Sequence, residues 1–295
     1  MRARAPASAA NLGPGFDVLA LALDLYVEVE VESAPRLTVV SEGEGAGLFD
    51  DASHLAARVA MDVAGHDRLA ITVRSEIPVA RGLGSSAALA VAAAAAAGSP
   101  DPLAVAARVD GHPENAAASV LGGLVVATSI RGSVRALKMG LDPDLEFVVV
   151  VPDRALATAK ARRALPAEVS REDATFNLGR LGLLLGGLAD RRVLTREAAE
   201  DRLHQDYRSP LFPEAPQILS ALHAGGSLAA CWSGAGPSLL AICDVRDSTS
   251  VEEAARAALH STGVPGRVMR LHPDSRGLVT GEAASMPVNG RRRGS

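Results

Sequence analysis

Apolar and polar positions follow two regular spacings along the chain, one typical of strands and one typical of helices. Residues 23–32 alternate apolar with mostly acidic side chains, the period of a strand that buries one face. Residues 145–151 are almost all apolar and stop at Pro152, which predicts a buried strand. Further strands are predicted at residues 36–40, 69–73, 227–231, 238–243 and 267–271, with another after a glycine turn within 119–128.

Helical spacing occurs in residues 53–64, where Leu55, Val59 and Val63 share one face. The alanine-rich residues 88–97 favour a helix strongly and are followed by a Gly-Ser-Pro stop. Further helices are predicted at residues 101–109, 158–164, 176–189, 195–204, 218–224 and 251–259. Because strands and helices do not alternate regularly, the pattern predicts an α+β fold with mostly antiparallel sheets covered by helices.

The buried strand at residues 145–151 lies near an expected domain junction. We therefore predict two domains, residues 1–150 and residues 151–275, which suits a chain of 295 residues. Residues 276–295 turn polar and end in a basic, glycine-containing segment, so we expect a disordered tail there.

Composition narrows the class of protein. Hydrophobic residues make up 48% of the chain and charged residues 22%, with a net charge of −4 and both signs mixed along the chain. This argues against nucleic acid as the main partner. We find no signal-like segment and no apolar run long enough to cross a bilayer. Cys231 and Cys243 are too few for a disulfide framework or a zinc site, so we expect a cytoplasmic protein without a membrane partner.

Residues 78–88, PVARGLGSSAA, are the most informative segment of the chain. Gly82 and Gly84 allow backbone angles that other residues avoid and a close approach of a ligand to the main chain. Ser85 and Ser86 stand where the alanine-rich helix would begin, and free N–H groups there favour an anion. The segment is no Walker A loop, because no lysine follows the last glycine. The alternative to a phosphate site is a glycine-serine turn before a buried helix.

Three other segments carry candidate chemistry. In residues 6–17, PASAANLGPGFD, Asn11 and Asp17 flank a Gly-Pro-Gly turn and could bind an ammonium and a hydroxyl, or simply form an Asx turn. In residues 110–115, DGHPEN, Asp110 could ligate Mg²⁺ and Glu114 could accept a proton or orient a hydroxyl. Both acids could instead stabilise a helix N-terminus, and His112 could be a structural histidine.

The third segment, residues 232–238, is a loop of mostly small residues, WSGAGPS, between two predicted strands. Its backbone could press against the glycine loop at residues 82–84 and close a site. The alternative is a hairpin with a glycine bulge.

These segments, in this order, resemble the GHMP kinase superfamily and, within it, the homoserine kinase family. The glycine loop matches the superfamily signature Pro-x-x-x-Gly-Leu-Gly-Ser-Ser-Ala-Ala at every defined position, and the resemblance covers about residues 4–241. It implies a GHMP kinase fold: an N-terminal ribosomal-protein-S5-domain-2-like α/β domain and a C-terminal ferredoxin-like α+β domain. The implied reaction is ATP-dependent, Mg²⁺-dependent phosphorylation of the side-chain hydroxyl of L-homoserine, a step of threonine biosynthesis.

The resemblance also implies roles for individual residues. ATP phosphates would be bound by Pro78, Gly82, Leu83, Gly84, Ser85, Ser86 and Ala87. The amino acid would be bound by Asn11, Asp17, His112 and Glu114, with Arg162 and Arg208 on its α-carboxylate. The catalytic residues would be Ser85, Thr158 and Glu114, with Thr158 near the reacting hydroxyl. Ser85, with Ser86 as the neighbouring option, and Asp110 would hold the magnesium ion.

The chain departs from the family pattern at four positions. Glu114 stands where an Asp is usual, Asp110 where a Glu is usual, and Ala104 where some members carry a magnesium carboxylate. His54 stands where an adenine-contacting Asn is common. A GHMP kinase for another small alcohol and a non-catalytic nucleotide-binding protein on the same fold are the alternatives, and a homodimer is plausible.

Overall fold

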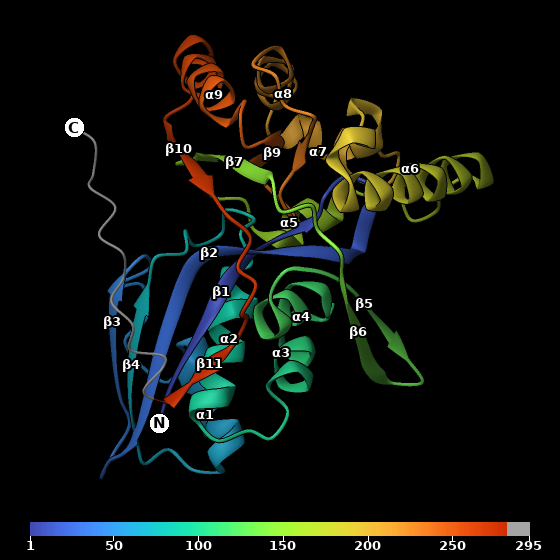
Figure 1. The fold of residues 1–295 in the computed structure, drawn as a ribbon. Coiled ribbons are helices and arrows are strands. Elements are labelled where there is room, and N and C mark those ends of the chain that lie inside the picture. Colours follow the sequence, from blue (N-terminus) through green and yellow to red (C-terminus); the bar gives the residue numbers. More distant parts are fainter. Residues whose placement is uncertain (282–295) are drawn as a thin grey trace.

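The computed structural model describes residues 1–281, with only the backbone described at Asp110, and contains two sheets (Figure 1). In the larger sheet the strand order is β11-β1-β2-β4-β3, with β5 paired to β2 and β6 to β5. Its strands are β1 (Arg2–Asn11), β2 (Gly15–Ser33), β3 (Thr38–Gly43), β4 (Leu69–Ser75), β5 (Leu124–Ile130), β6 (Ser133–Met139) and β11 (Val279–Thr280). Among the described strands, β3 and β4 form the one parallel pair.

The long strand β2 organises this sheet. It pairs with β5 through Leu19–Leu21 and with β4 through Val27–Ser33, so one strand serves two neighbours along its length. Val27, Val29 and Val31 are buried, whereas Glu28 and Glu30 between them are half-buried, which confirms the alternation predicted for residues 23–32.

Four helices cover one face of the larger sheet: α1 (Leu55–Ala64), α2 (Ser85–Ala96), α3 (Pro102–Asp110) and α4 (Glu114–Leu121) (Figure 1). The central helix α2 is buried on nearly all sides, and most of its residues are alanines. Because a methyl side chain takes little room, the other helices and the sheet can approach its backbone closely. The core therefore fixes the start of α2 at Ser85 with little freedom to move.

The second sheet has the order β10-β7-β9-β8 and is antiparallel. Its strands are β7 (Leu145–Pro152), β8 (Ala229–Trp232), β9 (Leu239–Asp244) and β10 (Gly266–Leu271). Val148 and Val150 face a cluster with α8 (Ala215–Ala224) and α9 (Ser248–Thr262), whereas Phe147 and Val149 join the core of the larger sheet. Strand β7 is thus buried on both faces, as its apolar run predicts.

Three further helices lie between β7 and β8 along the chain, namely α5 (Thr158–Arg163), α6 (Arg171–Ala189) and α7 (Gln205–Arg208), with short 3-10 turns at Arg191–Val193, Arg196–Ala199 and Ser209–Leu211. The predicted helix at residues 195–204 is wrong. Only Arg196–Ala199 is helical, because the Asp201 carboxylate accepts the N–H groups of Leu203, His204 and Gln205 and bends the chain.

Two predictions about chain organisation also need correction. Strand β11 pairs with β1, so residues 276–281 of the expected disordered tail are ordered; residues 282–295 lie outside the described part. The boundary predicted at residue 150 falls inside β7, which belongs entirely to the second sheet.

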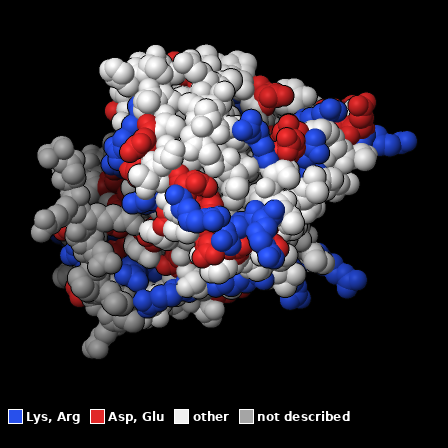
Figure 2. Space-filling view, turned by 45° about the horizontal axis from the view of Figure 1, so that its top comes forward, with Lys and Arg blue, Asp and Glu red and all other residues white. Residues whose placement is uncertain are grey.

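Charges are distributed without a single-sign surface on the face that Figure 2 shows, where Lys and Arg lie beside Asp and Glu. Within residues 1–281, we find no helix whose length and apolar character would let it cross a bilayer.

Candidate active site

A cavity of about 310 Å³ is lined by residues from both halves of the chain. Helices α2, α4 and α5 each begin at this cavity, with Ser85, Glu114 and Thr158 as their first residues. The predicted residues that line it are Asn11, Asp17, Gly82, Leu83, Gly84, Ser85, Ser86, Ala87, His112, Glu114, Thr158, Arg162 and Arg208. Pro78 is not in the lining, and the side chain of Asp110 lies outside the described part of the structure.

The glycine loop is held against the loop that precedes β9. Gly82 has φ of +76°, and a Cβ atom there would lie 2.2 Å from the Ser233 carbonyl oxygen. The Ser233 hydroxyl donates a 2.7 Å hydrogen bond to the Gly82 carbonyl, and the Ser238 N–H donates a 3.2 Å hydrogen bond to the Arg81 carbonyl. The predicted contact of residues 232–238 with the glycine loop is therefore present, and only glycine fits at position 82.

The start of α2 is open to an anion. Its N-cap is Gly84 at φ +63°, which has no side chain to cap the first N–H groups of the helix. A Cβ atom there would lie 2.1 Å from the Ser8 hydroxyl, which donates to Asn115 Oδ1 at 2.8 Å. Strand β1 and helix α4 thus pack behind the loop, while Ser85 faces the cavity with the positive end of the helix dipole.

Asn11 holds its own turn together. Its backbone has φ of +70°, its Oδ1 accepts the Asp17 N–H at 3.0 Å, and its Nδ2 donates to the Gly234 carbonyl at 2.8 Å. These contacts are the Asx-type structural role that the sequence left open. They also tie the end of β1 to the loop after β8, so Asn11 shapes the cavity wall; contact with a substrate stays a prediction.

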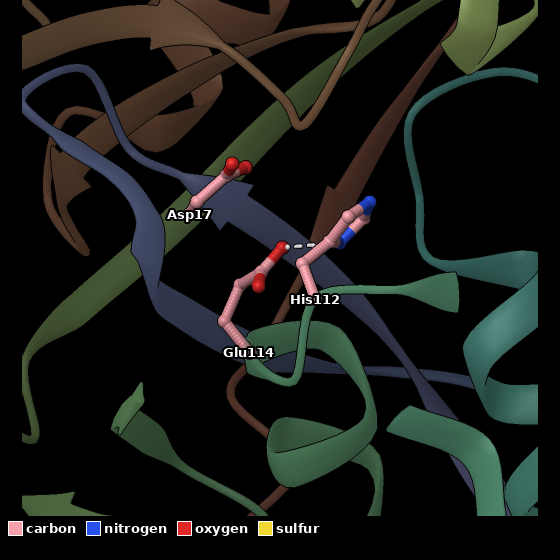
Figure 3. Close-up of side chains that lie close together, drawn as sticks. All are labelled: Asp17, His112 and Glu114. Carbon is pink, nitrogen blue, oxygen red and sulfur yellow. Dashed lines mark hydrogen bonds and ion pairs between the residues drawn. The ribbon is translucent and has the colours of Figure 1, made fainter. Parts of the chain in front are cut away.

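Asp17, His112 and Glu114 converge in the cavity, as Figure 3 shows, with their ligand atoms all within 4.8 Å of one another. His112 Nδ1 lies 3.1 Å from Glu114 Oε1, and this hydrogen bond raises the pKa of His112 above its ordinary value. Glu114 is buried, and its Oε2 has no hydrogen-bond partner among the described residues. The group thus offers a buried acidic oxygen to a cation.

Two arginines face this acidic group. Arg162 donates to Asp17 Oδ1 at 2.6 Å, whereas Arg208 makes no ion pair with a carboxylate in the described part of the chain. Burial, followed by the nearby charge of Arg162, lowers the pKa of Arg208 to about 10. Arg208 Nε is buried without a partner among residues 1–281. The cavity lining therefore includes both a cation without a bound carboxylate and a carboxylate with an oxygen lacking a hydrogen-bond partner, as far as residues 1–281 show.

Comparison with known proteins identifies the family to which the chain belongs. The model of the GHMP kinases N terminal domain matches residues 52–123, and that of the GHMP kinases C terminal domain matches residues 182–264. The homoserine kinase of Moorella thermoacetica is 38% identical over 94% of this chain and 98% of its own length. That of Deinococcus radiodurans is 40% identical over 95% and 96%. The chain belongs to the homoserine kinase family of the GHMP kinases.

Solved structures agree on the fold of this family. A homoserine kinase from Cytophaga hutchinsonii superposes with a TM-score of 0.83 at 23% identity, covering 95% of this chain and 96% of that chain. The mevalonate kinase of L. major, solved in complex with R-mevalonate, gives 0.69 at 14% identity over 94% and 96%. Both likenesses show the GHMP kinase fold, and the predicted family and fold class are confirmed.

Two of the departures from the homoserine kinase pattern lie at helix N-termini, and at His54 the side chain itself has a structural role. His54 is the N-cap of α1, where its Nδ1 accepts the Ala56 N–H at 3.1 Å. Ala104 lies in the first turn of α3, and its N–H is bound by the Asp101 carboxylate at 2.9 Å. Neither contact involves the cavity, whose lining includes neither residue.

Some residues in or behind the cavity carry no predicted role. Asn115 and Arg81 lie within quoted motifs, yet no role was assigned to either. Arg81 donates to the Pro152 carbonyl at 2.8 Å, and so ties the glycine loop to β7. Its only sequence signal is its place between Ala80 and Gly82. His204 was also missed; it contacts Arg208 and lies behind the cavity wall.

Proposed function

We propose that this protein transfers the γ-phosphoryl group of ATP to the side-chain hydroxyl of L-homoserine, giving O-phospho-L-homoserine and ADP. Membership of the homoserine kinase family supports this reaction. The observation that carries it is the charge arrangement of the cavity. An unpartnered Glu114 oxygen and an unpartnered Arg208 nitrogen, both buried, share one cavity with the N-terminus of α2. A zwitterionic amino acid and a polyphosphate complement this arrangement.

The ATP phosphates are proposed to lie on the glycine loop. Residues 82–87 surround the first turn of α2, whose N–H groups and dipole attract negative charge. The loop is pinned by Ser233 and Arg81, so it requires little reorganisation when an anion binds. Pre-ordered N–H groups of this kind stabilise the charge that develops on a transferred phosphoryl group.

L-Homoserine is proposed to lie between the acidic and basic walls. Its α-carboxylate would bind Arg208 and Arg162, since a guanidinium matches a carboxylate with two parallel hydrogen bonds. Its ammonium would bind Asp17 and the free oxygen of Glu114. Arg162 and Asp17 are already paired with each other at 2.6 Å. The substrate carboxylate would add a second negative partner for Arg162, and the substrate ammonium would add a second positive partner for Asp17.

A magnesium ion also fits the donors of this cavity, because Mg²⁺ prefers oxygen ligands and keeps several waters. The Ser85 hydroxyl in the lining would hold it together with phosphate oxygens and waters, whereas Ala104 supplies no ligand. When bound, Mg²⁺ neutralises phosphate charge. The part expected of Asp110 stays a prediction.

In the transfer step the substrate hydroxyl oxygen forms a bond to the γ-phosphorus while the bond from that phosphorus to the ADP oxygen breaks. We assign no general base, because a Glu114 carboxylate engaged by His112 and the substrate ammonium would be a poor one. The hydroxyl proton passes to an oxygen of the transferred group. Thr158 at the start of α5 is proposed to orient the hydroxyl, and positioning supplies most of the acceleration.

A coupled ADP-release assay across L-homoserine, mevalonate, shikimate and pantoate tests this function. We expect turnover with L-homoserine, loss of turnover with EDTA, and recovery with Mg²⁺. Turnover only with another alcohol would indicate a different GHMP kinase, and no ADP release with any acceptor would indicate a non-catalytic nucleotide-binding protein. The cytoplasmic location and the homodimer stay predictions from the sequence.

A further inference from the structure

His204 is completely buried between the Gly-Pro-Gly turn of residues 13–15 and the side chain of Arg208. Its backbone is fixed by Asp201, whose Oδ1 accepts the N–H groups of Leu203 and His204 at 2.7 Å each. The imidazole therefore enters the space behind the cavity from a rigid turn, immediately before α7.

The two ring nitrogens have different partners, and these define the tautomer. Nε2 lies 2.8 Å from the Gly13 carbonyl oxygen, which can only accept, so Nε2 carries the proton. Nδ1 is then an acceptor, and it receives Arg208 NH1 at 3.0 Å. Burial lowers the pKa of His204, in agreement with a neutral ring. Asp201 Oδ2, 3.6 Å from Nε2, is the nearest acid.

A second contact joins His204 to the same turn. Its ring stacks on Phe16 with centroids 5.3 Å apart, and Phe16 directly precedes Asp17. The Phe16 ring also lies 5.6 Å from the Arg208 guanidinium and 5.8 Å from that of Arg162. His204 thus contacts both the turn that carries Asp17 and one arginine of the opposite wall.

These contacts orient the Arg208 guanidinium but do not neutralise its charge. NH1 is held by two uncharged acceptors, His204 Nδ1 and the Gly234 carbonyl at 3.0 Å, and Nε has no partner among the described residues. A carboxylate in the place of the imidazole would bind the guanidinium equally well but would cancel its charge. A neutral acceptor leaves that charge available to a ligand.

We propose that His204 is a positioning residue that fixes the Arg208 guanidinium as a cation with no directly bound carboxylate and thereby sets the affinity of the amino-acid subsite. This inference rests on the proposed function, since it takes L-homoserine as the ligand whose carboxylate meets Arg208. The proposal gives His204 no contact with ATP, so replacing His204 should leave the KM for ATP unchanged.

The matched pair His204→Asn and His204→Asp tests the proposal. Both side chains can accept from Arg208 near the position of Nδ1, but only Asp is charged. We expect the KM for L-homoserine to rise at least tenfold more in His204→Asp than in His204→Asn, with the KM for ATP within twofold of wild type in both. A merely structural role would make the two variants equal, or would favour Asp through its ion pair; either result overturns the proposal.

A double-mutant cycle keeps the test decisive if the Asp variant folds poorly. We expect His204→Ala to raise the KM for L-homoserine about tenfold in the wild-type background and less than twofold in Arg208→Ala, because its effect passes through Arg208. The same factor in both backgrounds would overturn the proposal. His223→Asn, at a half-buried histidine bound to Ser227, is the control and should change neither constant.

The wild-type assay separates this inference from the proposed function. No wild-type turnover of L-homoserine would refute both. Normal wild-type turnover together with equal Asn and Asp variants would refute the role of His204 alone.

Discussion

At single residues of the cavity, the protein leaves charge only partly compensated. Arg208 is buried beside Arg162, and both effects lower its pKa, yet at about 10 the guanidinium remains protonated at neutral pH. Its fixed partners are a carbonyl and an imidazole. Burying a charge without an opposite charge costs free energy. A substrate carboxylate would offset that cost, so binding of the amino acid is coupled to relief of an unfavourable charge.

Replacing Arg208 should therefore act on one substrate. We expect Arg208→Ala to lower kcat/KM for L-homoserine by about 10- to 150-fold, since a hydrogen bond to a charged group contributes about 1.5–3 kcal/mol. The KM for ATP should change little. Arg208→Lys, which keeps the charge but loses the planar fork, should recover part of the loss. Steady-state kinetics with each substrate varied measures this, and equal losses for both substrates would contradict the assignment.

The His112 and Glu114 pair makes a pH-dependent contribution to stability. The hydrogen bond that His112 donates to the Glu114 carboxylate raises the pKa of His112 in the folded protein above its unfolded value of about 6.5. The stabilisation is thus fully present below that value and is lost as pH rises through the folded pKa. We expect wild type to unfold a few degrees above His112→Gln at pH 6, with the gap closing by pH 9. Thermal melts across this range check it, and a gap that widens with pH would be the opposite of our expectation.

How far the residues could be predicted depends on the range of their contacts. Ser85 and Gly84 follow from local sequence, because a glycine pair before a strong helix has a direct conformational meaning. The role of Asn11 in binding Gly234 joins positions 223 residues apart, and that of His204 joins positions 191 apart. Contacts between positions so far apart cannot be predicted from the local spacing of residues. Glu114 was a candidate from its segment alone, but its free oxygen became visible only from its neighbours.

At the scale of elements, the glycine loop and α2 behave as one unit. The loop is packed between Ser8 behind Gly84 and Ser233 beyond Gly82, so its shape is fixed by neighbours on both sides. The alanine-rich helix that follows is anchored in the core along almost its whole length. A displaced loop would therefore not be accommodated by a shift of the helix, and its N–H groups would lose their direction.

Gly82→Ala tests this rigidity. The added Cβ would meet the Ser233 carbonyl at 2.2 Å and would also have to adopt φ of +76°. We expect kcat/KM for ATP to fall at least tenfold. Gly65→Ala is the matched control, because Gly65 has φ of +73° but nothing within 4 Å of its Cβ position. In Gly65→Ala the only penalty should be the left-handed backbone conformation of alanine, which lowers the free energy of unfolding by about 1–2 kcal/mol. The kinetic constants should be unchanged. Equal activity in the two variants would show that the clash is absorbed.

Elements were predictable where one physical signal dominated. Alternation identified the half of β2 that pairs with β4, and apolar runs identified β7 and β9. Strand β1 was missed because its motif resembled a loop, and strand β6 because most of it is exposed. The false helix at residues 195–204 had suitable composition. It failed because the Asp201 side chain accepts N–H groups that a helix would have used.

For the whole molecule, the cavity depends on how the two sheets and their helices pack against each other. The N-terminal half contributes the glycine loop and Glu114, while Arg162, Arg208 and Gly234 come from the C-terminal half. The order of these segments along the chain is visible in the sequence, but their convergence is not, since it depends on how two sheets pack. The residues themselves suggested only the contact between residues 232–238 and the glycine loop, and resemblance to a known family supplied the rest.

The same packing predicts how the protein unfolds. One face of the second sheet, including Phe147, Val149 and Leu240, belongs to the core cluster that contains the larger sheet, and β11 returns from the second half to β1. Chains of this length often unfold domain by domain, but a shared core penalises exposing either half alone. Trp232, the single tryptophan, is buried in β8 and reports on the second sheet. We expect its fluorescence and the far-UV circular dichroism to give coincident urea transitions. A tryptophan transition at clearly lower urea would mean that the second sheet unfolds independently, and that the cavity can lose one wall while the other stays folded.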